Sequence, residues 1–185
     1  MTRTSFARLL LTSALAFGLA KPTLAALAVG TKAPAAIARA TLGGKEFDFS
    51  LAEALKKGPV VLYFFPAAFT PGCTMEAHEF AEAVADFNAA GASIIGVSRD
   101  PIDKLNKFSV SECRSKFPVA ADTDGKITTA YDAVLSKNPA YSDRTSYVIA
   151  PDGTIIYEYT NLDYAQHVTN TLKAVKDWKA AQNKN

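Results

Sequence analysis

The chain has 185 residues, of which 49% are apolar and 21% charged, and its formal net charge is +2. This length suits one globular domain with a single buried core, and the composition is that of an ordinary folded protein. The net charge is far too small for a basic face that would follow a phosphate backbone, so we expect no nucleic-acid partner.

The first 25 residues show the three parts of a signal peptide. The segment "MTRTSFAR" carries Arg3 and Arg8 without an acid, "LLLTSALAFGLA" is apolar, and "KPTLAALA" offers small residues for cleavage. We expect cleavage after Ala25 or Ala28. A stable membrane anchor is the alternative, but the apolar run is shorter than the ~20 residues that span a bilayer.

Removing residues 1–25 takes three bases and no acid from the chain, which leaves 17 bases against 18 acids. We therefore expect residues 26–185 to form a nearly neutral single domain. The signal peptide implies export, and we expect the bacterial periplasm because a redox enzyme needs a source of electrons. In such an oxidising compartment two cysteines can also form a purely structural disulfide.

After the leader, the pattern predicts an extended segment, a turn at Gly43 and Gly44, and a short helical piece. The run "PVVLYFF" (59–65) is apolar without alternation, which is typical of a strand covered on both faces. A helix is predicted over 74–90, because apolar residues recur at helical spacing and Gly91 follows as a stop.

The next segment, "SIIGVS" (93–98), predicts a second buried strand. Asp100 followed by Pro101 predicts the start of a helix that Asp100 caps. A short strand is then predicted at 118–122, and the segment "TDGKITTAYDAV" after it predicts a turn and a helix.

The last third of the chain predicts a β-hairpin and a final helix. Two β-rich runs surround a Pro-Asp-Gly turn at 151–153, and an amphipathic helix begins at about Asp163. Strands that alternate with helices demand parallel pairing and right-handed crossovers, while the hairpin adds antiparallel strands at one side. We therefore predict a thioredoxin-like α/β domain with a mixed central sheet flanked by helices.

Cys73, one of two cysteines, stands where a predicted strand gives way to a helix. Unpaired N–H groups at a helix N-terminus favour a thiolate, the form that acts as a nucleophile. Gly72 lets the backbone turn sharply, Thr70 supplies a hydroxyl that can donate and accept, and Pro66 withholds a backbone donor. Taken alone, Cys73 has the ordinary alternative of a buried cysteine that only packs.

The segment "PAAFTPGCT" (66–74) carries the spacing P-x-x-x-T-x-x-C, and in this the chain resembles the peroxiredoxins, which are thiol peroxidases on a thioredoxin fold. The continuation "TPGCTMEAHEF" is most similar to the bacterioferritin-comigratory-protein (PrxQ) branch of the AhpC/TSA family. The resemblance extends over almost the whole mature chain, through "VGTKAP" (29–34), "GVSRD" (96–100), "FPVAAD" (117–122) and "DRTSYVIAPDG" (143–153).

The resemblance implies a role for each matching residue. Cys73 is the expected peroxidatic thiolate. Arg144 matches the family's distant arginine, which is expected to lower the pKa of the thiol and to hold the peroxide oxygens through its forked donors. Thr70 is expected to hydrogen-bond the incoming hydroperoxide, and Pro66 to shield the sulfur from water. For Arg144 taken alone, a surface ion pair with Asp143 is the alternative.

Glu76 matches a glutamate of the branch and is expected to orient Arg144; the alternative is an exposed first-turn acid that favours the helix dipole. The resemblance implies reduction of hydrogen peroxide and organic hydroperoxides without a metal, heme, flavin or other cofactor. His78 and His167 have no second ligand at metal spacing, and we interpret both as solvated or packed side chains.

Within this resemblance, Cys113 is the expected resolving cysteine. Many PrxQ-type proteins place that residue five positions after the peroxidatic cysteine, where this chain has His78, and no cysteine follows Cys113. Members that resolve from the helix near Cys113 usually place the cysteine closer to its phenylalanine. An intramolecular disulfide with Cys73 is our hypothesis, and a bystander thiol is its alternative. Because disulfide Cα atoms lie within ~7 Å, bonding implies local unwinding.

The resemblance further implies peroxide substrates, a thioredoxin-like or glutaredoxin-like reductant, and a monomer or dimer. Two other functions fit the same fold. One is an exported thiol–disulfide oxidoreductase of the TlpA kind, which needs a C-x-x-C pair, and Cys73 is followed by "TMEAHEF" instead. The other is a non-enzymatic binding module in which a disulfide between Cys73 and Cys113 is only a staple.

Overall fold

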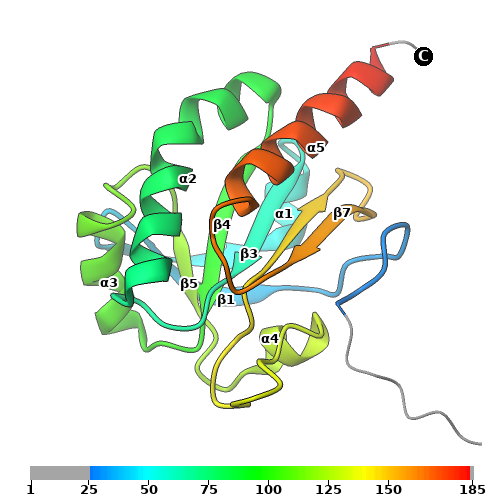
Figure 1. Ribbon diagram of the computed structural model, residues 1–185. Helices are drawn as coiled ribbons and strands as arrows, with labels where there is room; N and C mark the ends of the chain where they lie inside the picture. Colours follow the sequence, from blue (N-terminus) through cyan, green and yellow to red (C-terminus); the bar gives the residue numbers. More distant parts are fainter. Residues whose placement is uncertain (1–25, 184–185) are drawn as a thin grey trace, which may run out of the picture.

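A computed structural model describes residues 26–183, which form one seven-stranded sheet with helices on both faces (Figure 1). The expected signal peptide, residues 1–25, lies outside the described residues, so export and cleavage stay predictions. Among residues 26–183, no helix combines the length and apolar character that crossing a membrane requires.

The sheet has the strand order β2-β1-β5-β4-β3-β6-β7. Strands β3, β4 and β5 pair in parallel, while β6 and β7 form the predicted antiparallel hairpin at one side. The strands are β1 (Ile37–Leu42), β2 (Lys45–Ser50), β3 (Val60–Phe64), β4 (Ser93–Ser98), β5 (Val119–Ala121), β6 (Thr145–Ile149) and β7 (Ile155–Thr160). The predicted mixed sheet of a thioredoxin-like domain is therefore confirmed.

One strand was not predicted. The segment after Gly43 and Gly44 forms strand β2, which pairs with β1 as an antiparallel hairpin at the edge of the sheet. Only Phe49 of β2 is buried, and its other side chains are exposed or half-buried. Because charged residues interrupt this edge strand, its sequence lacks the continuous apolar run that marked β3 and β4.

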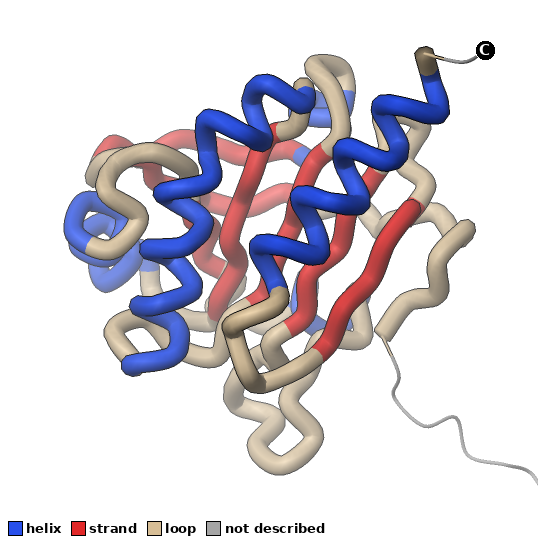
Figure 2. The backbone as a smooth tube through the Cα atoms, turned by 45° about the horizontal axis from the view of Figure 1, so that its top comes forward, coloured by secondary structure: helices blue, strands red, loops and turns tan. Residues whose placement is uncertain are grey.

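In the described part of the chain, five helices cover the sheet: α1 (Leu51–Leu55), α2 (Pro71–Ala90), α3 (Ile102–Ser111), α4 (Lys126–Ala130) and α5 (His167–Gln182). Helices α2 and α5 lie side by side across one face (Figure 2). Alternate residues of β3 are buried on opposite faces of the sheet. Val61 and Tyr63 pack on the face covered by α2, α3 and α5. Leu62 and Phe64 pack on the face covered by α1 and α4. This two-sided burial explains the unbroken apolar run of the strand.

Helix α2 begins at Pro71, three residues before the predicted start at Thr74, and therefore contains Cys73 in its first turn. Thr70 is the N-cap with an extended backbone, and Pro71 suits the first helical position because that position needs no N–H donor. Gly91 ends the helix, as predicted, with a φ of 87°.

Two predicted helix starts were wrong. The N-cap of α3 is Pro101, not Asp100, because the Asp100 carboxylate instead accepts hydrogen bonds from the Ala68 N–H (2.6 Å) and the Ser98 hydroxyl (3.0 Å). Helix α5 begins at His167 and not near Asp163, whose carboxylate accepts the Ala165 N–H at 3.1 Å in the preceding turn.

Candidate active site

Cys73 lies where the end of β3 meets the first turn of α2, and its side chain is only 2% exposed. The helix starts with the Thr74 N–H donating to the Thr70 carbonyl at 2.9 Å. The Cys73 Sγ accepts a hydrogen bond from Arg144 Nη2 at 3.4 Å. The helix terminus and the guanidinium both stabilise negative charge on this sulfur.

Arg144 reaches Cys73 because of the sheet. It directly precedes β6, and β6 pairs antiparallel with β3 so that Thr145 stands opposite Phe64. The guanidinium is buried and makes three contacts: Nη2 with Cys73 Sγ, Nη1 with Glu76 Oε2, and Nε with the Leu162 carbonyl at 2.9 Å.

The alternative of a surface ion pair between Arg144 and Asp143 is wrong. The Asp143 carboxylate accepts the backbone N–H of Arg144 at 2.8 Å, while the Arg144 side chain is 5% exposed and turns toward Cys73. The guanidinium is therefore directed into the site by three fixed partners, and its fork geometry suits this task better than a lysine would.

Glu76 is fully buried on the inner side of α2, so the alternative of an exposed first-turn acid is wrong. Burial raises the pKa of Glu76, and the positive charge of Arg144 opposes this shift. Burial alone would lower the pKa of Arg144, but the neighbouring charges of Glu76 and Cys73 outweigh it and raise that pKa. The two side chains thus form a buried pair that keeps the guanidinium cationic.

The loop 65–70 carries Pro66 and Thr70 and leads directly into the first turn of α2. The Thr70 hydroxyl is exposed and donates to the Ala67 carbonyl at 2.9 Å, which leaves its oxygen lone pairs free to accept. Phe69 adopts a φ of 68°, a strained conformation for a phenylalanine, and its ring packs edge-on against Phe108. The structure therefore links Arg144 and Glu76 to Cys73 and places Pro66 and Thr70 in the loop that leads to it, while Cys113 shares the buried cluster of Cys73.

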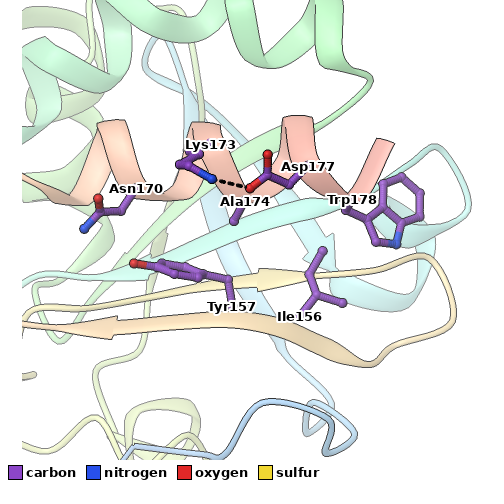
Figure 3. Close-up of a pocket in the computed structure, with 7 residues that line it drawn as sticks. All are labelled: Ile156, Tyr157, Asn170, Lys173, Ala174, Asp177 and Trp178. Carbon is purple, nitrogen blue, oxygen red and sulfur yellow. Dashed lines mark hydrogen bonds and ion pairs between the residues drawn. The ribbon is translucent and has the colours of Figure 1, made fainter. Parts of the chain in front are cut away.

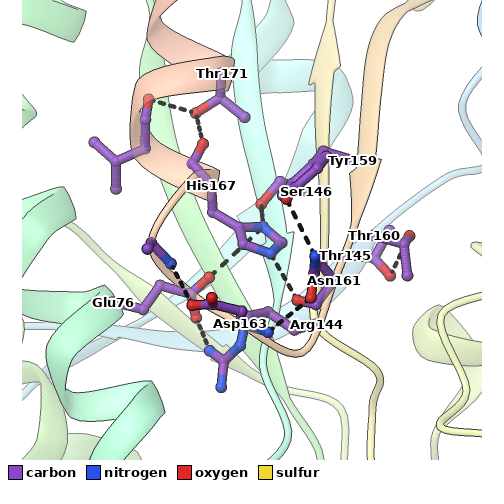
Figure 4. A network of polar contacts seen from close by, with 12 residues as sticks. Glu76, Arg144, Thr145, Ser146, Tyr159, Thr160, Asn161, Asp163, His167 and Thr171 are labelled. Atoms are coloured by element: carbon purple, nitrogen blue, oxygen red, sulfur yellow. Dashed lines mark hydrogen bonds and ion pairs between the residues drawn. The ribbon is translucent and has the colours of Figure 1, made fainter.

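Sequence reasoning missed the role of two further residues. Asp100 fixes the loop 65–70 through the Ala68 N–H, and it stood in the segment "GVSRD" that matched the family, where we took it for a helix cap. His167 is fully buried and lies beside Glu76 (Figure 4). The interpretation of His167 as a packed side chain is confirmed, but no local pattern indicated its neighbours.

His167 has a defined tautomer. Its Nε2 lies 2.8 Å from the Asn161 carbonyl oxygen, and because a carbonyl only accepts, Nε2 carries the proton. Nδ1 is then the acceptor for the Ser146 hydroxyl, also at 2.8 Å. Glu76 Oε1 lies 3.8 Å from the same Nδ1, so the imidazole connects α5 with the carboxylate that holds Arg144 (Figure 4).

Comparison with known proteins identifies the family. A family profile described as the AhpC/TSA family matches residues 29–158, which is more than half of the chain. The chain belongs to the AhpC/TSA family. Its relatives are peroxiredoxins of the Bcp and PrxQ branch, and the predicted resemblance is therefore confirmed. As a peroxiredoxin, the protein is a thiol peroxidase and an oxidoreductase.

Two relatives show the degree of similarity. Peroxiredoxin Bcp of Xanthomonas campestris is 31% identical over 122 residues, which cover 63% of this chain and 76% of that protein. Peroxiredoxin Bcp of Bacillus subtilis is 34% identical over 123 residues, which cover 64% of this chain and 78% of that protein.

Two solved structures have the same fold as this chain. Peroxidoxin BcpB from Mycobacterium tuberculosis superimposes with a TM-score of 0.73 at 27% identity, covering 80% of this chain and 96% of that one. Peroxiredoxin Q of Xanthomonas campestris gives a TM-score of 0.67 at 27% identity, covering 76% of this chain and 90% of that one.

In this peroxiredoxin, Cys113 is a free, fully buried thiol just after α3, and burial raises its pKa. The residues on both sides of it contact α2: Glu112 with His78 at 2.9 Å, and Arg114 with Glu82. Arg114 and the next residue, Ser115, have φ values of 51° and 55°. Two adjacent residues in the left-handed region strain this turn, and the side-chain contacts with α2 hold it in place.

Two further observations on the peroxiredoxin concern metal binding and a surface groove. Within residues 26–183, no group of three or more His, Cys, Asp or Glu side chains is placed to hold a metal ion. A groove between β7 and α5 is lined by Tyr157 and Trp178, and the Lys173–Asp177 ion pair lies along its α5 side (Figure 3). None of the predicted site residues lines this groove.

The buried imidazole predicts an acid-dependent loss of stability. Burial lowers the pKa of His167 from 6.5 to about 4, so between these pH values the unfolded chain binds a proton that the folded chain refuses. The unfolding free energy therefore falls as the pH falls. From pH 7 to 4.5 we expect wild type to lose about 2 kcal/mol more than His167→Gln in urea unfolding.

Glu76 also changes the unfolding free energy with pH, and its raised pKa acts in the opposite direction. Because wild type and His167→Gln both contain Glu76, its contribution cancels when their losses of stability are compared. His78→Gln is the matched control, because the His78 side chain is 31% exposed and lies outside this network. An equal loss of stability in wild type and His167→Gln would contradict the prediction.

Proposed function

We propose that this peroxiredoxin reduces hydrogen peroxide and organic hydroperoxides through the thiolate of Cys73. The observation that carries the proposal is the contact of Arg144 Nη2 with Cys73 Sγ at 3.4 Å, at the N-terminus of α2. A nearly buried sulfur beside a fixed cation and unpaired N–H groups is stabilised as an anion, the reactive form of cysteine.

The proposed reaction begins with attack of the thiolate on the nearer oxygen of the peroxide, in line with the O–O bond. The S–O bond forms as the O–O bond breaks, and the electron pair leaves on the distal oxygen as hydroxide or alkoxide, which takes a proton. Arg144 and the N–H groups of the first turn of α2 stabilise this developing charge. Cys73 becomes a sulfenic acid.

Two residues are proposed to place the substrate. The Thr70 hydroxyl already donates to Ala67, so its oxygen accepts the O–H of the hydroperoxide. Pro66 is half-buried and has no N–H, so it covers the sulfur without offering a competing donor. Glu76 holds the guanidinium in the orientation in which Nη2 faces Cys73.

Cys113 is proposed to resolve the sulfenic acid. Its sulfur attacks Cys73 Sγ, the S–S bond forms, the S–O bond breaks, and water leaves with the thiol proton. A thioredoxin-like or glutaredoxin-like dithiol then reduces the disulfide to two thiols. Because Cys113 is fully buried, its segment must first open locally, and the strained turn at Arg114 and Ser115 favours that opening.

Peroxide consumption tests the proposal, with dithiothreitol and with thioredoxin as separate reductants. We expect wild type to turn over with both. Cys113→Ser should retain the dithiothreitol-driven rate, because the small thiol reaches the sulfenic acid directly, and should lose most of the thioredoxin-driven rate. Mass spectrometry of wild type after one equivalent of peroxide should show the loss of two hydrogens.

A lasting sulfenic or sulfinic acid on Cys73, with Cys113 still reduced, would exclude the resolving role. Reduction of insulin without peroxide consumption would instead favour a thiol–disulfide oxidoreductase. A disulfide that forms in air and resists thioredoxin, without any peroxidase activity, would favour a structural staple. Export to the periplasm and assembly as a monomer or dimer stay parts of the proposal.

A further inference from the structure

His167 contacts neither the sulfur nor the guanidinium, yet it lies between the two groups that hold Arg144 in place (Figure 4). One is Glu76, on α2, and the other is the loop 161–164, between β7 and α5. The roles proposed above for the site residues make no use of this fully buried imidazole. The inference below rests on the proposed function of Cys73.

On its Nε2 side, His167 fixes the loop 161–164 at both ends. The imidazole donates to the Asn161 carbonyl at 2.8 Å, and the backbone N–H of His167 donates to the Tyr164 carbonyl at 3.1 Å. Between these two contacts, the Leu162 carbonyl accepts Arg144 Nε at 2.9 Å. The position of this acceptor for the guanidinium therefore depends on a loop that His167 holds.

The same loop contacts Arg144 a second time and reaches the peroxidatic turn. The Asn161 N–H donates to the Arg144 carbonyl at 3.1 Å, so backbone and side chain of the arginine are both tied to the loop. A Cβ at Gly72 would lie 3.2 Å from Arg144 Nη2 and 3.9 Å from Tyr164. Arg144 and Tyr164 thus both lie against the residue that precedes Cys73.

On the other side of the ring, Nδ1 carries no proton and acts as a hydrogen-bond acceptor. The Ser146 hydroxyl donates to Nδ1 at 2.8 Å, and Glu76 Oε1 lies 3.8 Å away. Burial lowers the pKa of His167 to about 4, so the imidazole is neutral at neutral pH. A neutral ring does not compete with Arg144 for the Glu76 carboxylate, whereas an imidazolium would attract that carboxylate and repel the guanidinium.

The other charged or titratable groups around the ring come from β7, from the loop 161–164 and from the residue that precedes β6. Tyr159 of β7 packs edge-on against it with ring centres 4.8 Å apart, and Asp163 of the loop favours its protonated form. Arg144 acts in the opposite direction and favours the neutral form. Burial is the largest of these effects, so the ring is uncharged at neutral pH.

We propose that His167 is a positioning residue for peroxide reduction: it holds the loop 161–164 and leaves Glu76 to Arg144, and so keeps Nη2 of Arg144 against Cys73 Sγ. An ordinary core histidine would contribute to stability alone. A positioning histidine also changes the reactivity of a sulfur that it never contacts. The two roles are therefore separated by measurements on Cys73 itself.

The test compares His167→Asn, His167→Gln and a control. A glutamine amide extends far enough to donate to the Asn161 carbonyl in place of Nε2, whereas the shorter asparagine does not. We expect His167→Asn to slow the oxidation of Cys73 by hydrogen peroxide by roughly tenfold to a hundredfold, since small displacements of a catalytic group have effects of this size. His167→Gln should stay within about threefold of wild type.

The pH profile of Cys73 alkylation by iodoacetamide gives a second readout, because only the thiolate reacts. The profile of His167→Asn should shift to higher pH, and that of His167→Gln should follow wild type. Thr171→Val is the matched control: Thr171 is fully buried one turn further along α5 and bonds only backbone carbonyls. It should lower the melting temperature without changing either readout.

A wild-type rate constant and alkylation profile in folded His167→Asn would overturn the proposal. If His167→Asn does not fold, Ser146→Ala replaces it, since it removes only the hydroxyl that donates to Nδ1. An alkylation profile of Ser146→Ala shifted to higher pH then supports the proposal, and an unchanged one overturns it. Failure of the proposed function is recognised separately, because wild type would then consume no peroxide or Cys73→Ser would consume it at the wild-type rate.

Discussion

Replacing Cys73 by serine is expected to reduce peroxide turnover to the background rate, a loss on the order of 10³-fold or more. A serine hydroxyl stays protonated at neutral pH, and neither the first turn of α2 nor Arg144 can ionise it. The fold should survive, since the two side chains differ by one atom. Peroxide consumption with dithiothreitol measures the effect.

Cys113→Ser is the matched control for this prediction. It also exchanges a buried thiol for a hydroxyl, and it should keep the dithiothreitol-driven rate. Turnover by Cys73→Ser at a rate close to that of wild type would show that another group reacts with peroxide. The assignment of the nucleophile would then be wrong.

Replacing Arg144 by lysine is expected to slow the reaction of Cys73 with hydrogen peroxide by roughly 10²-fold. A single ammonium does not reproduce the three contacts of the guanidinium with Cys73, Glu76 and the Leu162 carbonyl. It keeps a positive charge beside the buried carboxylate, which limits the loss of stability that an uncharged side chain would cause. Competition for peroxide against a reference peroxidase gives the rate constant.

Arg39→Lys is a suitable control, because the Arg39 guanidinium also contacts two acids, Glu46 and Asp48, but on the exposed β1–β2 hairpin. It should leave the rate constant unchanged. An Arg144→Lys variant as fast as wild type would mean that charge alone, without the fork geometry, accounts for the reactivity of the sulfur.

The surroundings of Cys73 were predictable because they are local. A strand of apolar residues, a proline, a threonine and a glycine within eight positions of Cys73 determine a turn into a helix, and the structure has that turn. The error of three residues at the start of α2 arose because the apolar periodicity begins only after the first turn. Pro71 was the better signal for this boundary.

Arg144 is a different case. It is 71 positions from Cys73, and it comes close only because β6 pairs with β3. No periodicity or spacing in the sequence carries that information, and the expectation came entirely from the resemblance to the peroxiredoxins. Glu76 was ambiguous for a related reason, since its buried neighbours Arg144 and His167 come from distant parts of the chain.

Side-chain networks were the least predictable part. Asp100 was taken for a helix cap because aspartate favours that position, but its carboxylate turns to the Ala68 N–H of the loop beside the sulfur. His167 is similar: its partners Asn161, Ser146 and Glu76 come from three different elements. Such contacts follow from tertiary packing, which local propensity does not describe.

The most direct test of the central claim is to find which sulfur hydrogen peroxide oxidises first. In Cys113→Ser, one equivalent of peroxide in the presence of dimedone should give a single adduct on Cys73, because the sulfenic acid has no resolving thiol. We expect peptide mapping to find this adduct within seconds of mixing. Peroxide that remains unconsumed for minutes, with Cys73 still a free thiol, would contradict the account.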